Sequence, residues 1–186
     1  MVKKLIFSGF LSLVIFMQVT FAQVFDDVDI ILHPVSGNIY YIEGRGGNIG
    51  LLHGDDGILL VDDQYAPLTN KITDAIKQLS HQPVRYIINT HMHPDHTGGN
   101  ENFGRLGAMI VGHENVRSQM IKAGYNQTPP FVTFSEDVTF YINDEVVHAF
   151  KVPNAHTNND SFIKFKNANV IHTGDVFRSE SYPYID

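Results

Sequence analysis

The 186-residue sequence predicts a layered α/β or α+β sandwich, and three observations support this fold class. Short β-type runs follow one another between residues 30 and 62. Strand and helix patterns then alternate between about residue 67 and residue 123, and β-type runs return from residue 131 onward. Antiparallel strands on both sides of helix-bearing crossovers favour a sandwich over a barrel or a helical bundle.

In the first half of the chain, glycine-rich or Gly-Asp-Asp turns separate three predicted antiparallel strands, at residues 38–43, 48–53 and 57–62. The segment 44–47, Gly-Arg-Gly-Gly, is expected to be a flexible turn. Pro67 then occupies the first turn of a predicted helix that reaches residue 79, because its apolar residues recur at helical spacing.

In the second half, we predict strands at residues 84–90, 108–111, 138–142, 145–152, 161–165 and 169–172. A helix is expected between Glu114 and Ala123, with Gly124 ending it. The aromatic side chains of Phe131, Phe134, Phe140 and Tyr141 are expected to belong to the core.

Composition excludes several classes of function. With 13 basic and 20 acidic residues the formal charge is -7, and no tract of lysine or arginine is long enough to follow a phosphate backbone. Nucleic acid is therefore not expected as a partner. The chain has no cysteine, so disulfides and thiolate metal ligands are excluded. Any metal must be bound through nitrogen and oxygen.

Residues 1–22 have the pattern of a secretory signal peptide: Lys3 and Lys4, an apolar stretch, and a small-residue cleavage site ending at Ala22. The alternative is an uncleaved membrane anchor. In either case residues 23–186 would form the domain, which would lie in the periplasm or outside the cell. No later run resembles a membrane span. Removing two lysines and no acid leaves 11 basic and 20 acidic residues, a charge of -9.

The segment His91-Met-His-Pro-Asp-His96 directly follows a predicted buried strand, and the carboxyl ends of such strands are where open α/β sheets place their ligands. In an extended chain His91 and His93 project the same way, while Pro94 turns the chain and redirects Asp95 and His96. This geometry suits two adjacent metal ions. Ordinary surface or core histidines are the alternative, but burying these groups together is costly unless a cation compensates.

Four segments carry a family resemblance. The run 89–100, Asn-Thr-His-Met-His-Pro-Asp-His-Thr-Gly-Gly-Asn, resembles the signature of the metallo-β-lactamase superfamily. Residues 57–62 resemble the family's strand that ends in a structural aspartate. Residues 153–161 resemble its third-histidine segment, and residues 170–175 resemble the segment that carries its bridging aspartate.

The resemblance implies an αββα sandwich with a zinc site at one edge and one or two Zn²⁺ ions per chain. The implied ligands are histidines and aspartates: His91, His93 and His156 for the first ion, Asp95 and His96 for the second, and Asp175 between the two. The family's second ion normally takes a further histidine from later in the chain, and none follows His172. The domain is therefore expected to lack its C-terminal part.

Two positions discriminate among functions within the resemblance. Oxygen-reducing di-iron members carry a carboxylate where this chain has His93, so hydrolysis is favoured. Many zinc β-lactamases carry a cysteine where this chain has Asp175, which weakens that assignment without excluding β-lactam turnover.

We therefore expect an exported zinc-dependent hydrolase that uses a metal-bound hydroxide to attack the carbonyl of a small ester, thioester, lactone or lactam. Asp95 is the expected catalytic residue, because its carboxylate could orient the hydroxide or carry its proton. The alternatives are a β-lactamase proper and a metal-binding member without catalysis. The oligomeric state stays open.

Three further polar residues have simpler expected roles. Asp62 is expected to fix a ligand or a loop rather than bind metal, because metal-binding imidazoles usually donate their other N–H to an outer partner. Asp63 is expected to face solvent or cap a helix. His113 is expected to have a structural role or to lie at the surface.

Overall fold

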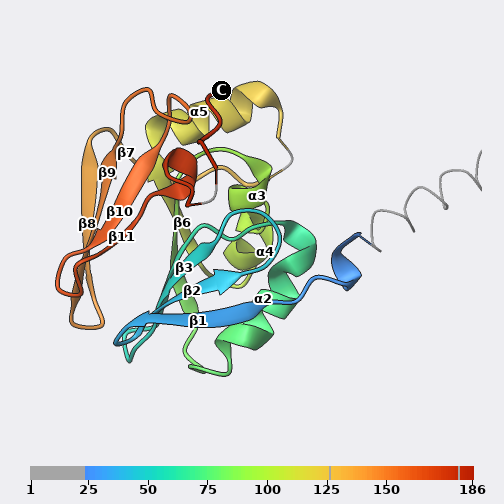
Figure 1. Cartoon of the computed structure of the whole chain (residues 1–186), viewed down its shortest axis with the longest axis vertical. Coiled ribbons are helices and arrows are strands. Elements are labelled where there is room, and N and C mark those ends of the chain that lie inside the picture. Colours follow the sequence, from blue (N-terminus) through green and yellow to red (C-terminus); the bar gives the residue numbers. More distant parts are fainter. Residues whose placement is uncertain (1–23, 126, 180) are drawn as a thin grey trace, which may run out of the picture.

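The computed structural model describes residues 24–125, 127–179 and 181–186 (Figure 1). The predicted signal peptide, residues 1–22, lies outside the described residues. Among the helices that the structure describes, none is both long enough and apolar enough to cross a membrane.

The larger sheet has seven strands in sequence order. They are β1 (Ile31–Ser36), β2 (Ile39–Glu43), β3 (Ile49–Leu52), β4 (Ile58–Val61), β5 (Val84–Asn89), β6 (Met109–His113) and β7 (Val132–Phe134). The pairs from β1 to β4 are antiparallel, and those from β4 to β7 are parallel. The parallel half aligns the carboxyl ends of β4 and β5 at one edge of the sheet, where the histidine motif begins.

The smaller sheet has four antiparallel strands in the order β11-β10-β9-β8. They are β8 (Asp137–Ile142), β9 (Glu145–Lys151), β10 (Ser161–Phe165) and β11 (Val170–His172). Its inner face packs against the larger sheet through apolar side chains that include Val147, Ile163 and Phe165, which meet Leu59, Val61 and Ile88.

Helices cover the opposite face of the larger sheet. They are the 3-10 turn η1 (Ala66–Leu68), α2 (Thr69–Ile76), α3 (Pro94–Thr97), α4 (Asn100–Arg105) and α5 (Glu114–Ala123). A second apolar core forms where Ile72 of α2 and Phe103 of α4 pack against Leu60 and Ile87 of the sheet. A further 3-10 turn, η2 (Gly174–Val176), follows β11.

The described residues thus build three layers, helices on sheet on sheet (Figure 1), and the predicted layered fold class is confirmed. Figure 1 shows no helix of the described chain over the outer face of the β8–β11 sheet. Of the implied αββα arrangement, the described residues thus form three layers: one of helices and two of strands.

Two details differ from the sequence prediction. The short helices α3 and α4 were not expected, because four and six residues are too few to show helical periodicity. Of the four aromatic residues assigned to the core, Phe134 is buried and Phe140 is partly buried. Phe131 and Tyr141 are instead exposed, at 66% and 82% of their surface. Tyr141 lies on the outer face of its strand, because successive strand residues alternate between faces.

Candidate metal centre

The histidine motif starts where strand β5 ends. Thr90 follows the strand, and His93 occupies the N-cap position of α3, with Pro94 as its first residue. Proline suits that position because its fixed φ fits a helix start and its missing N–H is not needed there. After this turn His93 and His96 belong to two different groups of donor atoms, and His91 belongs to both.

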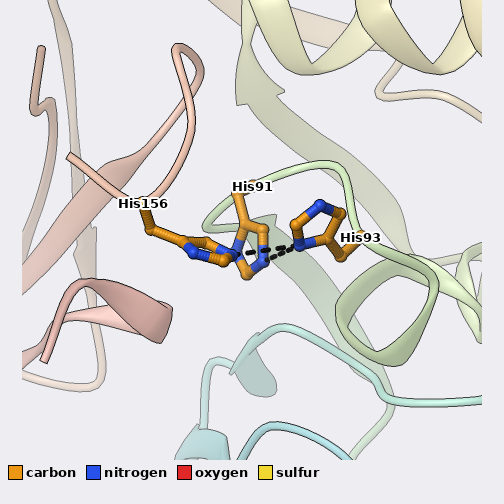
Figure 2. A group of neighbouring side chains, drawn as sticks. All are labelled: His91, His93 and His156. Carbon is orange, nitrogen blue, oxygen red and sulfur yellow. Dashed lines mark hydrogen bonds between the residues drawn. The ribbon is translucent and has the colours of Figure 1, made fainter. Parts of the chain in front are cut away.

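Three imidazoles converge on one point. Nε2 of His91 and Nε2 of His156 each lie 3.1 Å from Nδ1 of His93 (Figure 2). His156 comes from the loop between β9 and β10 of the smaller sheet, 63 residues further along the chain. The fold therefore brings together the first three predicted ligands. We call these three residues the histidine cluster.

In each ring of the histidine cluster, one nitrogen faces the other two rings (the inner nitrogen) and one faces away (the outer nitrogen). The partners of the outer nitrogens show which ring atoms carry protons. Thr90 Oγ1 donates to Asp62 Oδ2 at 2.7 Å, so it accepts from Nδ1 of His91 at 2.9 Å. The carbonyl oxygen of Tyr184 accepts from Nδ1 of His156 at 2.6 Å. The carboxylate of Asp186 accepts from Nε2 of His93 at 3.0 Å. In the neutral imidazoles, all three inner nitrogens then present lone pairs to one another.

A second group lies beside the first. His96 Nε2 is 3.2 Å from Asp175 Oδ1 and 3.6 Å from Asp95 Oδ2, and His96 Nδ1 donates to Asp62 Oδ2 at 2.7 Å. We call His96, Asp95 and Asp175 the carboxylate cluster. One carboxylate, Asp62, therefore supports both clusters, through Thr90 in one case and directly in the other.

The two clusters have opposite protonation chemistry. Burial, together with the neighbouring His96, His93 and His156, lowers the pKa of His91 far below its usual value. Burial also lowers the pKa of His96, but the carboxylates of Asp62, Asp175 and Asp95 outweigh it and raise that pKa to about 10. Hydrogen bonding to His96 lowers the pKa of Asp175, which therefore stays ionised at neutral pH.

These side chains fit metal ions. Nε2 of His96 is buried and faces two carboxylates, those of Asp175 and Asp95. Nitrogen and oxygen donors from His91, His93 and His156, and from His91, His96 and Asp175, form two groups whose donor atoms lie within 4.8 Å of one another. Imidazole and carboxylate are the donor types that zinc accepts. A cation among these donors would relieve the crowding of lone pairs in the histidine cluster.

A sequence profile of the metallo-beta-lactamase superfamily matches residues 34–186. The chain belongs to this superfamily. The membership inferred from the motifs is thereby confirmed, and the fold neighbours agree with it.

Among solved structures, the DIM-1 metallo-beta-lactamase superposes with a TM-score of 0.73 at 15% identity, covering 83% of this chain and 73% of that one. A metallo-beta-lactamase from Pontibacter korlensis gives a TM-score of 0.65 at 23% identity, covering 74% and 67%. The subclass B3 enzyme BJP-1 of Bradyrhizobium japonicum gives 0.66 at 22%, covering 81% and 62%. At these sequence identities the likeness is evidence for the fold alone.

A curated relative, the coenzyme F420H(2) oxidase of Methanothermobacter marburgensis, is 35% identical over 63 residues. The match covers 32% of this chain and 16% of that protein. The chain is thus similar to proteins named as lactamases and, over a short segment, to one named as an oxidase.

A cleft of about 850 Å³ opens onto the carboxylate cluster, and its lining includes Asp95, His96 and Asp175 together with Tyr41 and Phe177. The loop at 44–47 forms part of its wall. A Cβ added to Gly46 would lie 2.6 Å from Cβ of Asp95, and one added to Gly47 would lie 2.1 Å from Cε1 of His96. The loop is therefore packed closely against the cluster, which differs from the flexible turn expected by default.

The structure decides between the two roles expected for Asp63 and places two other residues. Asp63 does not face solvent, because its side chain is buried, and burial raises its pKa well above the usual value. Its Oδ1 instead accepts the N–H of Gly99, the N-cap residue of α4, in agreement with the helix-capping alternative. His113 is structural, since Nδ1 accepts the N–H of Asn115 at the start of α5. Asp62 contacts Thr90 and His96, as a residue that fixes ligands should.

Sequence reasoning missed Asp186, and it did not foresee the contact that the backbone carbonyl of Tyr184 makes. Their contacts with His156 and His93 span 28 and 93 residues, and no local pattern marks them. A carboxylate near a predicted ligand in space cannot be recognised from spacing when the two residues lie so far apart in the chain.

Proposed function

We propose that this protein is an exported, zinc-dependent hydrolase that attacks the carbonyl carbon of a small ester, thioester, lactone or lactam. The observation that carries the proposal is the convergence of three imidazoles: Nδ1 of His93 lies 3.1 Å from Nε2 of His91 and 3.1 Å from Nε2 of His156. Beside them lies His96, which is flanked by two carboxylates. Membership of a superfamily of mostly hydrolytic metalloenzymes supports it.

The proposed ligands are divided between the two clusters. The histidine cluster would hold the first ion through His91, His93 and His156. Asp95 and His96 would hold the second, and Asp175 would lie between the two, as its place near both His91 and His96 supports. Bound zinc lowers the pKa of a coordinated water to about 7, which supplies a nucleophile at neutral pH.

The side chains favour hydrolysis over oxygen chemistry. Position 93 carries an imidazole, so the three residues proposed for the first ion alone all offer nitrogen donors, which suits zinc better than a di-iron pair. Asp95 lines the cleft with a side chain that is 28% exposed, so its carboxylate can reach both the second ion and solvent. We propose that Asp95 orients the attacking water and carries its proton.

The cleft supports a small-molecule substrate. Its volume of about 850 Å³ lies in the range of small-ligand pockets, and it reaches the carboxylate cluster directly. Tyr41 and Phe177 give it apolar walls, and Arg178 adds a cation.

The test is metal analysis of the purified protein, joined to a substrate panel of esters, thioesters, lactones and a chromogenic cephalosporin. We expect one or two zinc ions per chain and hydrolysis of at least one non-lactam class. His93→Ala should lose both, whereas His148→Ala, on the outer face of the smaller sheet, is the matched control and should retain both.

Other outcomes would redirect the proposal. Rapid turnover of the cephalosporin alone would identify a β-lactamase proper. Stoichiometric zinc without hydrolysis of any substrate would identify a metal-binding protein without catalysis. No transition metal at all would overturn the proposal.

Export is proposed from residues 1–22 alone. Expression with those residues, followed by fractionation and N-terminal sequencing, should find a mature chain that starts at Gln23 outside the cytoplasm. An intact Met1 on cytoplasmic protein would contradict export and leave the hydrolase proposal untouched.

A further inference from the structure

The segment from Tyr184 to Asp186 lies against the histidine cluster and makes three contacts with it. The carbonyl of Tyr184 accepts from Nδ1 of His156 at 2.6 Å, and the N–H of Asp186 donates to the carbonyl of His156 at 2.9 Å. The carboxylate of Asp186 accepts from Nε2 of His93 at 3.0 Å. The segment thus touches both the ring and the backbone of one proposed ligand and the ring of another.

These contacts decide which nitrogens face the metal position. An imidazole has two nitrogens and, when neutral, one proton, so an acceptor on one nitrogen leaves a lone pair on the other. Carbonyl and carboxylate oxygens only accept. With Tyr184 holding the proton on Nδ1 of His156 and Asp186 holding it on Nε2 of His93, the free pairs fall on the two nitrogens that are 3.1 Å apart.

We propose that Asp186 is a positioning residue of the metal centre, which, together with the carbonyl of Tyr184, fixes His93 and His156 in the ring orientations and tautomers that present Nδ1 and Nε2 to one ion. The proposal rests on the proposed function, because it assumes that the histidine cluster binds a metal. Outer partners of this kind orient ligating imidazoles and raise their basicity.

His93 needs such support more than His91 does. The ring of His91 is fully buried and is held by Thr90, which Asp62 fixes in turn. The side chain of His93 is 21% exposed, and its only outer partner in the described chain is the carboxylate of Asp186. Without that carboxylate, the ring is free to rotate and to bind a proton on the inner nitrogen.

The test compares Asp186→Ala and Asp186→Asn with wild type in the full chain. Zinc affinity is measured by competition with a chromophoric chelator, and thermal unfolding is followed in parallel. We expect Asp186→Ala to weaken binding by about 10- to 100-fold. Asp186→Asn should lose less, because its amide oxygen can still accept from Nε2. The matched control is Asp137→Asn, which alters another aspartate beside a histidine, His148, away from the site.

A second measurement separates positioning from general stability. In the zinc-loaded protein, nitrogen-correlated NMR should show a slowly exchanging Nε2 proton on His93. Asp186→Ala should make that proton exchange rapidly, while the Nδ1 proton of His91 stays unchanged. Deleting residues 184–186 should weaken zinc binding further than Asp186→Ala, because His156 also loses its acceptor.

The outcomes distinguish the two proposals. Wild type that binds zinc, with Asp186→Ala equal to it in affinity and proton exchange, would overturn the positioning role and leave the metal centre standing. An equal loss in Asp137→Asn would also overturn it. Wild type that binds no transition metal would overturn both.

Discussion

The histidine cluster and the carboxylate cluster lie side by side but hold charge in opposite ways. The first consists of three imidazoles, and the buried His91 in it strongly resists protonation. The second sets one imidazole against two carboxylates, and the pKa of His96 rises to about 10. A cation can therefore enter the first cluster without displacing a proton from His91, whereas at the second it must displace a proton from His96.

This difference shows how one fold prepares two sites for different ion affinities. The rings of His91 and His96 lie 4.1 Å apart, centroid to centroid, and both depend on Asp62. The contrast arises from the neighbours of each ring: burial lowers the pKa of both, other histidines lower that of His91 further, and carboxylates raise that of His96. The following experiments should separate the clusters or show that they act as one.

The largest effect should come from removing one ring of the histidine cluster. His156→Ala leaves two nitrogens at the first site, so we expect zinc affinity there to fall by more than about 100-fold, beyond the loss typical of an outer partner. Isothermal titration of the metal-free protein would measure it. Two binding events of wild-type strength in this variant would show that His156 is no ligand.

Replacing the shared support should weaken both clusters together. In Asp62→Asn an amide N–H would face the donors of Thr90 or His96, so we expect each site to lose about 10- to 100-fold in zinc affinity. Asp63→Asn is the matched control, because burial raises the pKa of Asp63 well above the usual value and an amide resembles its neutral acid. Loss at one site alone would show that the clusters are supported separately.

A narrower change should affect the carboxylate cluster only. Gly47→Ala places a Cβ 2.1 Å from the ring of His96, so the ring or the loop must move. Such overpacking costs about 1–3 kcal/mol, so we expect about a tenfold loss of affinity at the second site and none at the first. The control is Gly104→Ala, where a Cβ meets nothing within 4 Å. Equal weakening of both sites would mean that the loop supports the whole centre.

The smallest effect is a pH dependence of the metal-free protein. The raised pKa of His96 contributes stability that is complete below about 6.5 and is lost as pH rises toward about 10. The lowered pKa of His91 acts the other way, so its contribution is lost as pH falls below 6.5. We expect thermal unfolding of His96→Gln to lose the alkaline decline that wild type shows. A decline of equal size in both proteins would refute this assignment.

Much of the fold and of the candidate centre could be predicted from local sequence. Strands such as β5 and β10 are apolar runs bounded by turns, and α5 begins and ends at its predicted residues. The histidine motif is contiguous, so its chemistry and its place after a strand were visible at once. His156 and Asp175 could be included only through the family resemblance, because their approach to the motif is a long-range contact.

The rest depends on packing between distant segments. The sequence leaves open whether Asp63 faces solvent or caps a helix, because its burial beside Gly99 depends on how the end of β4 meets the start of α4. The loop at 44–47 carries glycines for close approach to Asp95 and His96, but a glycine-rich turn looks the same in sequence when it touches nothing. Asp186 is an ordinary acidic residue until the chain folds back on His93.

The proposed donors come from both β-sheets: His91 follows β5 of the larger one, while His156 and Asp175 follow β9 and β11 of the smaller one. An ion held among them would act as a cross-link between the two halves of the sandwich. Its affinity would then add directly to the free energy of folding, by about 2.7 kcal/mol at a free zinc concentration 100 times the dissociation constant. Chelation would loosen the whole domain as well as emptying one pocket.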